Sequence, residues 1–309
     1  MKHQEYCYEG KLINTDRNRR FTRSVESLTE AMDDGIILEG ISYLCDSDRH
    51  LHVKLGAIEG IIPRQECVYT QGGLPEKDIA IISRVGKAVC FKVKSIEEDE
   101  NGNALAILSR RDAQRDCMRE RISLLRSGDV IEAKITRLDP FGAFCDIGCG
   151  IISLLPIDCM SVSRISHPRD RFRNGQIIRA VVKNDCDEFG RITLTHRELL
   201  GTWEENASRF TAGQTAAGIV RSIEDYGVFI ELAPNLAGLA ECRDDVRVGQ
   251  SAAVYIKNII PDRMKVKLAI IDCIDSEQRI PDYEYPNSDH IDYWKYSPDG
   301  CSKIIESTF

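Results

Sequence analysis

The 309-residue sequence lacks the signals of several common protein classes. No apolar run approaches the roughly 18 residues that a membrane-spanning helix needs, and the N-terminus MKHQEYCYEGK has no apolar region after its charges. None of the 12 cysteines fall in the two-apart pairs typical of metal sites, and several lie inside apparent strands. We therefore expect a cytoplasmic protein with no membrane span and no metal site.

Catalytic signatures are missing as well. The sequence has no phosphate-binding glycine loop, no metal-spaced cluster and no paired carboxylates in a catalytic context. His167 and His196 have no carboxylate or nucleophile at a spacing that suggests acid-base chemistry. We expect that the protein is not an enzyme and binds no cofactor.

A surplus of positive charge is also lacking, since 41 basic and 49 acidic side chains give a net charge of −8. The charge is unevenly distributed. Acidic residues gather after Ile271, whereas the probable loop from Ser163 to Arg173 carries four arginines. Because local fields rather than the total charge act on a bound anion, this loop predicts an anionic partner.

A repeated segment dominates what is present. The stretch from Ser127 to Leu155 reads SGDVIEAKITRLDPFGAFCDIGCGIISLL, and its first half alternates apolar and polar residues as a half-buried strand does. Phe141 and Phe144 are three residues apart, so strict alternation would place them on opposite faces of a strand. Gly142 lies beside a turn, where a bulge or a positive φ would aim both rings the same way.

Two further copies of this segment flank it. In the later copy, residues 212–270, Tyr226-Gly227-Val228-Phe229 falls on Phe141-Gly142-Ala143-Phe144. In the earlier, more divergent copy, which begins at Gly35, Arg49 and His52 take the aromatic positions. One chain therefore uses the same aromatic-glycine arrangement twice.

These segments resemble the RNA-binding domain of the ribosomal protein S1 family, which is a five-stranded barrel of the OB type. The stretch YGVFIELAPNLAGLAE is especially similar to short clostridial-type members. The resemblance implies a mainly β protein of three tandem five-stranded OB-type barrels joined by short α-helices.

The predicted order of parts follows from this repeat. It is an N-terminal arm (1–27), a degenerate S1-like barrel (28–110), a linker helix (111–126), an RNA-binding barrel (127–195), a second linker helix (196–211), another RNA-binding barrel (212–272) and an acidic, aromatic tail (273–309). The arm is expected to be extended or disordered and the tail flexible or loosely docked. The first barrel is either a docking domain or a degraded copy kept for folding.

The resemblance also implies a binding site. Aromatic rings on one sheet face stack unpaired bases at about 1–3 kcal/mol each, whatever the base. The family's third-strand histidine has no counterpart, because its place falls on Pro156 and Glu241. The predicted RNA-binding residues are Phe141, Phe144, Arg169, Arg171, Arg173, Arg191, Tyr226, Phe229, Lys265 and Lys267.

Some of these side chains have competing interpretations. Phenylalanines in strands are usually core residues, which would leave no platform. Trp203 is expected to pack against a barrel rather than to stack a base, and His167 and His196 are interpreted as polar surface or RNA contacts. The acidic tail offers a further hypothesis, in which it folds over a basic groove and competes with RNA.

The function predicted from the sequence is the binding of single-stranded RNA, in particular mRNA, in translation at the small ribosomal subunit. Single-stranded RNA and that subunit are the expected partners. Two alternatives are a protein-interaction scaffold and an accessory subunit of an RNA-degradation complex.

Overall fold

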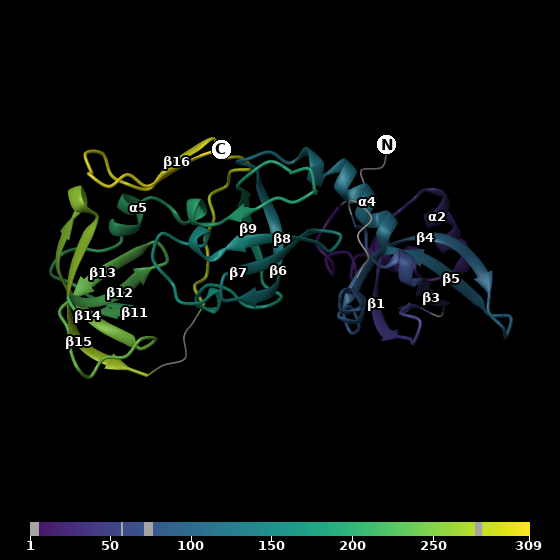
Figure 1. The fold of residues 1–309 in the computed structure, drawn as a ribbon, viewed down its shortest axis with the longest axis horizontal. Helices are drawn as coiled ribbons and strands as arrows, with labels where there is room; N and C mark the ends of the chain where they lie inside the picture. The colour runs from purple at the N-terminus through teal and green to yellow at the C-terminus, as the bar shows by residue number, and fades with distance from the viewer. Residues whose placement is uncertain (1–5, 57, 71–76, 276–279) are drawn as a thin grey trace. The chain divides into compact units, whose positions relative to one another are not determined.

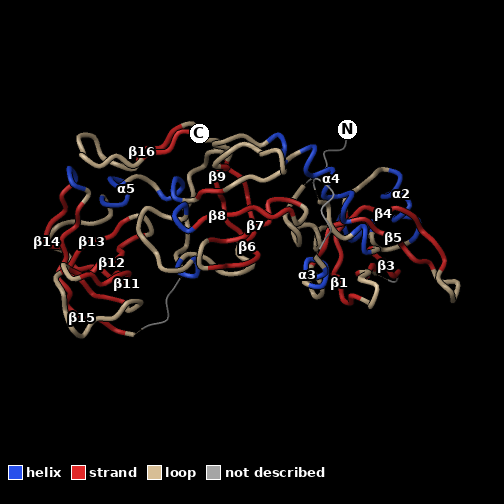
Figure 2. The backbone as a smooth tube through the Cα atoms, in the orientation of Figure 1, coloured by secondary structure: helices blue, strands red, loops and turns tan. Residues whose placement is uncertain are grey.

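The computed structural model describes residues 6–56, 58–70, 77–275 and 280–309. Strands outnumber helices and form three five-stranded sheets, which confirms the predicted fold class (Figure 2). Residues 1–125, 146–152 and 186–191 form one compact unit, and the rest form a second. The predicted domain boundaries stay a prediction. No helix within the described ranges is long and apolar enough to span a bilayer.

The first sheet is a closed barrel with the strand order β1-β2-β3-β5-β4. Only the β3–β5 pair is parallel. Its strands are β1 (Leu38–Cys45), β2 (Leu51–Leu55), β3 (Ile58–Ile62), β4 (Ala88–Glu98) and β5 (Ala104–Ser109). The helical elements around it are α1 (Asp16–Phe21), α2 (Val25–Asp33), η1 (Arg64–Glu66), α3 (Asp78–Ile82), α4 (Arg110–Glu120) and η2 (Ile122–Leu124). Alternate residues of the strands point inward, so a continuous apolar core fills the barrel.

The N-terminal segment is part of this barrel's fold, so the expectation of an extended arm is wrong for the described residues. Thr15 caps α1 by accepting a hydrogen bond from the Asn18 N–H. The Asn18 side chain then bonds both backbone groups of Glu39 on β1, at 2.8 and 2.9 Å. Phe21 completes the attachment by packing into the barrel core.

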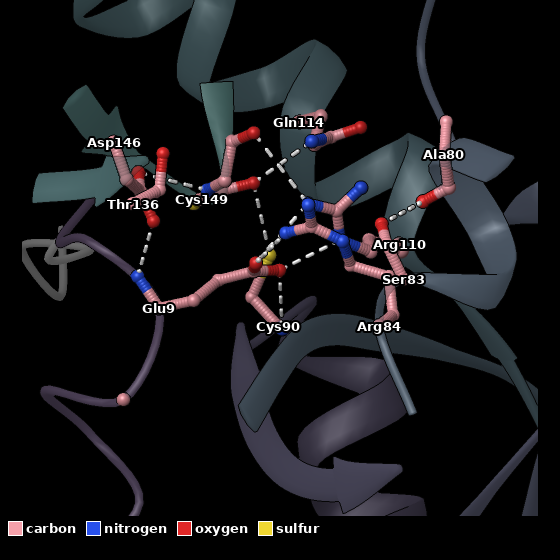
Figure 3. Close-up of polar contacts among 12 residues, drawn as sticks. Glu9, Ala80, Ser83, Arg84, Cys90, Arg110, Gln114, Thr136, Asp146 and Cys149 are labelled. Carbon is pink, nitrogen blue, oxygen red and sulfur yellow. Dashed lines mark hydrogen bonds and ion pairs between the residues drawn. The ribbon is translucent and has the colours of Figure 1, made fainter. Parts of the chain in front are cut away.

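The buried carboxylate Glu9 connects the N-terminal segment to β4 and α4 within the first unit (Figure 3). Glu9 Oε1 accepts from Arg110 Nε at 2.6 Å and from the Cys90 N–H at 3.1 Å, and Oε2 lies 3.1 Å from Arg110 Nη2. Burial opposes ionisation of Glu9, but the Arg110 guanidinium outweighs it and holds the pKa of Glu9 below its usual value. The Glu9 N–H donates to Asp146 Oδ2 at 2.8 Å, and burial followed by the Glu9 charge raises the pKa of Asp146 to about 6.

The second sheet has the order β10-β9-β6-β7-β8. Its strands are β6 (Val130–Asp139), β7 (Gly142–Gly148), β8 (Ile151–Pro156), β9 (Ile177–Val182) and β10 (Leu194–Thr195). Short 3₁₀ turns follow at η3 (Ile157–Cys159), η4 (Pro168–Asp170) and η5 (Arg197–Leu200). A parallel bridge between Leu154 and Thr193 brings the two edges of this sheet together.

The third sheet is a closed barrel with the order β11-β12-β13-β15-β14. It contains β11 (Thr215–Glu224), β12 (Gly227–Ala233), β13 (Leu236–Ala240), β14 (Ser251–Ile260) and β15 (Lys265–Ile274), with α5 (Trp203–Ala207) before it and η6 (Pro261–Arg263) between its last two strands. Trp203 is buried in the core of this barrel, which confirms the packing role predicted for it.

The C-terminal tail is packed on the second unit, so the expectation of a flexible segment is wrong for residues 280–309. Its strands β16 (Tyr293–Lys295) and β17 (Glu306–Thr308) form a hairpin, and Trp294 and Tyr296 join the third barrel's core. The tail lies beside α5, where the Trp203 N–H donates to the Tyr296 carbonyl at 3.0 Å (Figure 1). Deleting the tail would therefore remove core residues.

The arginine-rich loop is tied to the third barrel by buried ion pairs. Arg171 is fully buried, and its Nη2 lies 2.8 Å from Glu231 Oε1 on β12. Arg221 on β11 also pairs with Glu231, and its Nη1 lies 3.2 Å from Asp170 Oδ1. Arg171 Nη2 donates further to the Pro234 carbonyl at 3.0 Å. A charge this deeply buried needs such compensation. Asp170, Arg171, Arg221 and Glu231 therefore form one buried ion-pair cluster, which we call the joint.

Breaking this joint will destabilise the second unit. We expect Arg171→Met to lower the free energy of unfolding by about 3 kcal/mol or more, because Glu231 loses part of its buried compensation. Arg173→Met is the matched control, since Arg173 is exposed two residues away and should change stability by less than about 0.5 kcal/mol. Urea unfolding of both variants measures this, and equal stabilities would contradict the structural role.

A buried histidine joins the tail to the second sheet. His196 Nδ1 lies 3.3 Å from the Met160 carbonyl, and Nε2 lies 3.0 Å from the Tyr285 hydroxyl. The ring also packs edge-on against Phe172, Tyr283 and Tyr285. Burial and the nearby Arg171 charge lower the pKa of His196 to about 4, although the Met160 contact opposes them. The prediction that His196 is a surface residue is therefore wrong.

The His196 environment predicts a specific acid sensitivity. Its pKa is about 4 when folded and near 6.5 when unfolded, so the unfolded chain binds the extra proton between these values. The free energy of unfolding is therefore unaffected by His196 above pH 6.5. It decreases by about 3 kcal/mol as the pH falls from 6.5 towards 4. We expect His196→Gln to remove this part of the pH dependence in chemical unfolding between pH 4 and 7. His50→Gln, in the other unit, is the control, and an unchanged slope in His196→Gln would refute the assignment.

Candidate nucleic-acid interface

The two phenylalanines of the middle sheet lie together at its surface. The centroids of Phe141 and Phe144 are 5.9 Å apart, and their planes meet at 89° in an edge-to-face pair. The Phe141 side chain is 55% exposed, and Phe144 is half-buried. Phe141 belongs to the turn before β7 rather than to the strand, so strand alternation does not separate the rings. We call this pair the middle platform.

Gly142 is needed here for space rather than for a special backbone angle. Its φ lies outside the left-handed range, which excludes the positive φ, one of the two possibilities that the sequence left open at this glycine. A Cβ at this position would lie 2.6 Å from the Leu155 carbonyl oxygen and 3.1 Å from Pro156 Cα on β8. The glycine thus lets β8 approach the turn closely, next to Phe141, whose carbonyl accepts from the Ile157 N–H at 3.0 Å.

The third barrel repeats the arrangement closely. Tyr226 and Phe229 have centroids 6.0 Å apart and planes at 90°, and Tyr226 is 70% exposed. Tyr226 again lies in the turn, and a Cβ on Gly227 would be 2.6 Å from the Ala240 carbonyl oxygen. In this barrel a register shift does occur, but it lies on β11, the strand that pairs with β12, between Val220 and Ser222. We call this pair the third platform.

Strand register places a basic residue in line with the third platform. Phe229 pairs with Leu239 on β13, and Leu239 pairs with Lys267 on β15. Paired residues project from the same face, so the exposed Lys267 lies about 10 Å from Phe229, two strand spacings away. Lys265 is also exposed, two residues earlier on the same strand. Glu241, in the place of the family's histidine, pairs with Lys257 at 2.9 Å.

The middle platform has a different basic neighbour. The bridge from Leu154 leads to Thr193, so the position that corresponds to Lys267 carries no charge. Instead the Arg137 guanidinium lies 5.0 Å from the Phe144 ring centroid in a cation–π contact. The sequence prediction did not include Arg137. Its place on β6, the strand before the one that carries Phe144, could have indicated it. Arg191 is exposed, pairs with Asp187 at 2.9 Å and stacks on Phe189 at 4.7 Å.

The loop arginines separate into two kinds. Arg169 and Arg173 are exposed, as a phosphate contact requires. Arg171, between them, is buried against Glu231, which removes it from the residues that we propose for phosphate contact. A buried charge paired with a carboxylate cannot reach a ligand without exposing that carboxylate.

The first barrel carries no aromatic pair at the corresponding position. His52 lies between two carboxylates, 2.8 Å from Glu59 and 3.2 Å from Asp46. Burial opposes protonation of His52, but the two carboxylates outweigh it and raise its pKa. Arg49 pairs with Asp78 at 2.9 Å. The exposed Tyr43 ring packs edge-on against His52, with 6.1 Å between centroids, and its hydroxyl donates to Glu59, so this face combines a polar network with one exposed ring. Nor does the described part of the chain hold three or more His, Cys, Asp or Glu side chains in a group that suits a metal ion.

Comparison with known families identifies the middle segment. Residues 124–197 match the model of the S1 RNA binding domain. These residues belong to the S1 domain family. The S1 domain thus contains the middle platform, Arg137 and the loop with Arg169 and Arg173.

Relatives of the whole chain agree with this assignment. The chain is 29% identical over 230 residues to a small ribosomal subunit protein bS1 homolog of Bacillus cereus, covering 72% of this chain and 58% of that protein. It is 31% identical over 202 residues to small ribosomal subunit protein bS1 of Leuconostoc lactis, covering 62% and 46%. The resemblance to the ribosomal protein S1 family is thereby confirmed, and the chain spans about half the length of these relatives.

A solved structure also matches part of the chain. It is a multidomain protein with nucleic acid binding domains from Streptococcus pneumoniae, 14% identical, with 77% of this chain and 74% of that chain covered. The TM-score is 0.24, which does not establish a shared overall arrangement.

The close approach at Gly142 is directly testable in the S1 domain. We expect Gly142→Ala to destabilise the second unit by about 1–3 kcal/mol, because the added methyl forces β8 away from the turn. Gly227→Ala should have an effect at least as large, because its Cβ would meet the Ala240 carbonyl in the same way and its φ of +153° is one that residues with a side chain rarely adopt. Thermal and urea unfolding of both variants check this, and wild-type stability in either would contradict the crowding argument.

Proposed function

We propose that this chain binds single-stranded RNA by stacking bases on the middle and third platforms. The observation that supports this most is the repetition of one geometry on two barrels. In each, a strongly exposed ring in the turn meets a half-buried ring on the strand edge-to-face, beside a glycine that a neighbouring carbonyl oxygen approaches closely. Core residues would not leave 55% and 70% of a ring in solvent twice.

Stacking of this kind tolerates any base, because every base has a π-face. We therefore infer little sequence preference. Affinity comes from the rings and from the neighbouring cations, Arg137 at the middle platform and Lys265 and Lys267 at the third.

Further phosphate contacts come from Arg169, Arg173 and Arg191, all of which are exposed. The net charge of −8 does not oppose this assignment, because much of the acidic charge lies in the tail and a local field acts on the phosphates. The buried joint at Arg171 keeps the two platform-bearing sheets of the second unit connected. A strand of RNA thus meets two stacking surfaces on one folded body.

The role in the cell follows from the relatives named above, which are small ribosomal subunit proteins. We propose that the chain acts in the cytoplasm in translation and holds messenger RNA near the small ribosomal subunit. The first barrel, which lacks a platform, is the part that we assign to docking. It exposes apolar side chains on β1 and around α3, among them Ile41, Leu44 and Ile79.

The platforms are tested by measuring RNA binding. We expect a labelled, unstructured RNA of about ten nucleotides to bind the wild-type chain, and Phe141→Ala/Phe144→Ala to weaken binding by about 1 kcal/mol or more, the low end for one lost stack. Fluorescence anisotropy at several salt concentrations gives the affinity. The logarithm of the association constant should fall with the logarithm of salt at a slope of about −2 to −3.5, the value for about three to five neutralised phosphates.

Tyr293→Ala is the matched control, because Tyr293 is an exposed aromatic on β16, outside both platforms. It should leave RNA affinity unchanged. If the folded wild-type chain does not bind RNA, or if the double substitution has no effect, the platforms do not stack bases. A protein-interaction scaffold or an accessory role in an RNA-degradation complex would then account better for the barrels.

A further inference from the structure

A cavity of about 290 Å³ in the first unit shares no residue with either platform. The elements around it are α3, α4, the turn between β7 and β8, and the hairpin that contains Phe189. The side chains that give it its chemistry are Tyr69, Arg84, Arg110, Met118, Phe189 and Arg191. Three guanidinium groups and two aromatic rings therefore line one small space.

Arg84 is the least satisfied of these arginines. Its Nε is buried and has no hydrogen-bond partner among the described residues. Its Nη1 lies 3.4 Å from Glu9 Oε2, but Glu9 is already held by Arg110 at 2.6 and 3.1 Å (Figure 3). A guanidinium has five N–H donors, so most of those on Arg84 remain available to an acceptor in the cavity. Burial and the neighbouring Arg110 lower the pKa of Arg84, an effect that a bound anion would offset.

The opposite part of the lining supplies a ring. Phe189 is 59% exposed, and the Arg191 guanidinium stacks on it with 4.7 Å between Cζ and the ring centroid. Arg191 Nε also donates to Asp187 Oδ2 at 2.9 Å, which holds the guanidinium beside the ring. An exposed ring with a fixed cation beside it suits a planar base that carries a phosphate.

The cavity wall is already ordered by hydrogen bonds. Gln114 accepts from the Tyr69 N–H at 2.9 Å and donates to the Cys149 carbonyl at 2.9 Å. The volume lies at the small end of the range of roughly 300–1,000 Å³ for small-molecule sites. It suits one nucleotide rather than a segment of a strand.

We propose that this cavity binds one nucleoside 5′-phosphate, with the phosphate at Arg84 and Arg191 and the base against Phe189. The same chemistry is supplied by a free mononucleotide or by a nucleotide of an RNA. The site lies in the first unit, where elements of the first barrel meet β8 and the turn that carries Phe189, and it contains none of the four platform rings.

The test is isothermal titration of the full chain with adenosine 5′-monophosphate. We expect binding by the wild type, and a dissociation constant that rises roughly fivefold or more in Phe189→Ala and in Arg84→Gln. Arg17→Gln, an exposed arginine of the same unit, is the control and should bind as the wild type does. Adenosine, which lacks the phosphate, should bind much more weakly. Phe189 is exposed, so its substitution leaves a folded chain even if Arg84→Gln does not fold.

Absence of binding by the wild type, or an unchanged dissociation constant in folded Phe189→Ala, overturns the proposal. The titration is repeated in Phe141→Ala/Phe144→Ala. Unchanged affinity there separates this site from the platforms, and lost affinity assigns the nucleotide to the platforms and also overturns the proposal.

Competition with a ten-nucleotide RNA separates the two sources of the ligand. If only 5′-phosphorylated RNA displaces adenosine 5′-monophosphate, the ligand is an RNA end. If RNA displaces it with or without that phosphate, the ligand is an internal nucleotide. If neither RNA displaces it, the ligand is a free mononucleotide.

Discussion

The buried ion pairs around Arg171 and Glu231 are the interaction on which the second unit depends. They connect the loop after the middle sheet to two strands of the third barrel, where water is excluded and an uncompensated charge would be costly. The tail reinforces the same place, since the Tyr283 hydroxyl donates to the Arg171 carbonyl at 3.1 Å. Both platform-bearing sheets are thereby held within one unit.

The middle and third platforms show one ring geometry with different charged neighbours. Both place the outer ring in a turn and the inner ring on a strand, and both rely on a glycine that makes room for a neighbouring carbonyl. The positive charge is supplied differently, by Arg137 over Phe144 in one and by Lys267 in line with Phe229 in the other. The ring geometry is thus shared by the two sheets, whereas the neighbouring cation comes from a different strand in each, β6 in one and β15 in the other.

In the first unit, ion pairs rather than an aromatic pair occupy the corresponding face and the interior. Its outer face at His52 is satisfied by carboxylates, and its interior is organised around Glu9 and Arg110. The donors left over on Arg84, together with the exposed ring of Phe189, lie at a cavity rather than on a flat surface. The cavity therefore combines cations of the first barrel with a ring from the turn between β9 and β10, the arrangement on which the proposed nucleotide site rests.

From the sequence, alternation predicted the strands and repetition predicted the matching ring pairs Phe141–Phe144 and Tyr226–Phe229, because both are local patterns. The barrels themselves were predicted from the resemblance to S1 domains, and the packing of Trp203 from its large apolar area. Only the tertiary structure decided that Arg171 is buried while Arg169 and Arg173 are exposed, since its partner Glu231 lies far along the chain. The same reason explains the N-terminal segment and the tail, which look solvated by composition but are held by Glu39 and by the third barrel's core. It also explains Gly142, because what makes the glycine necessary is the approach of another strand.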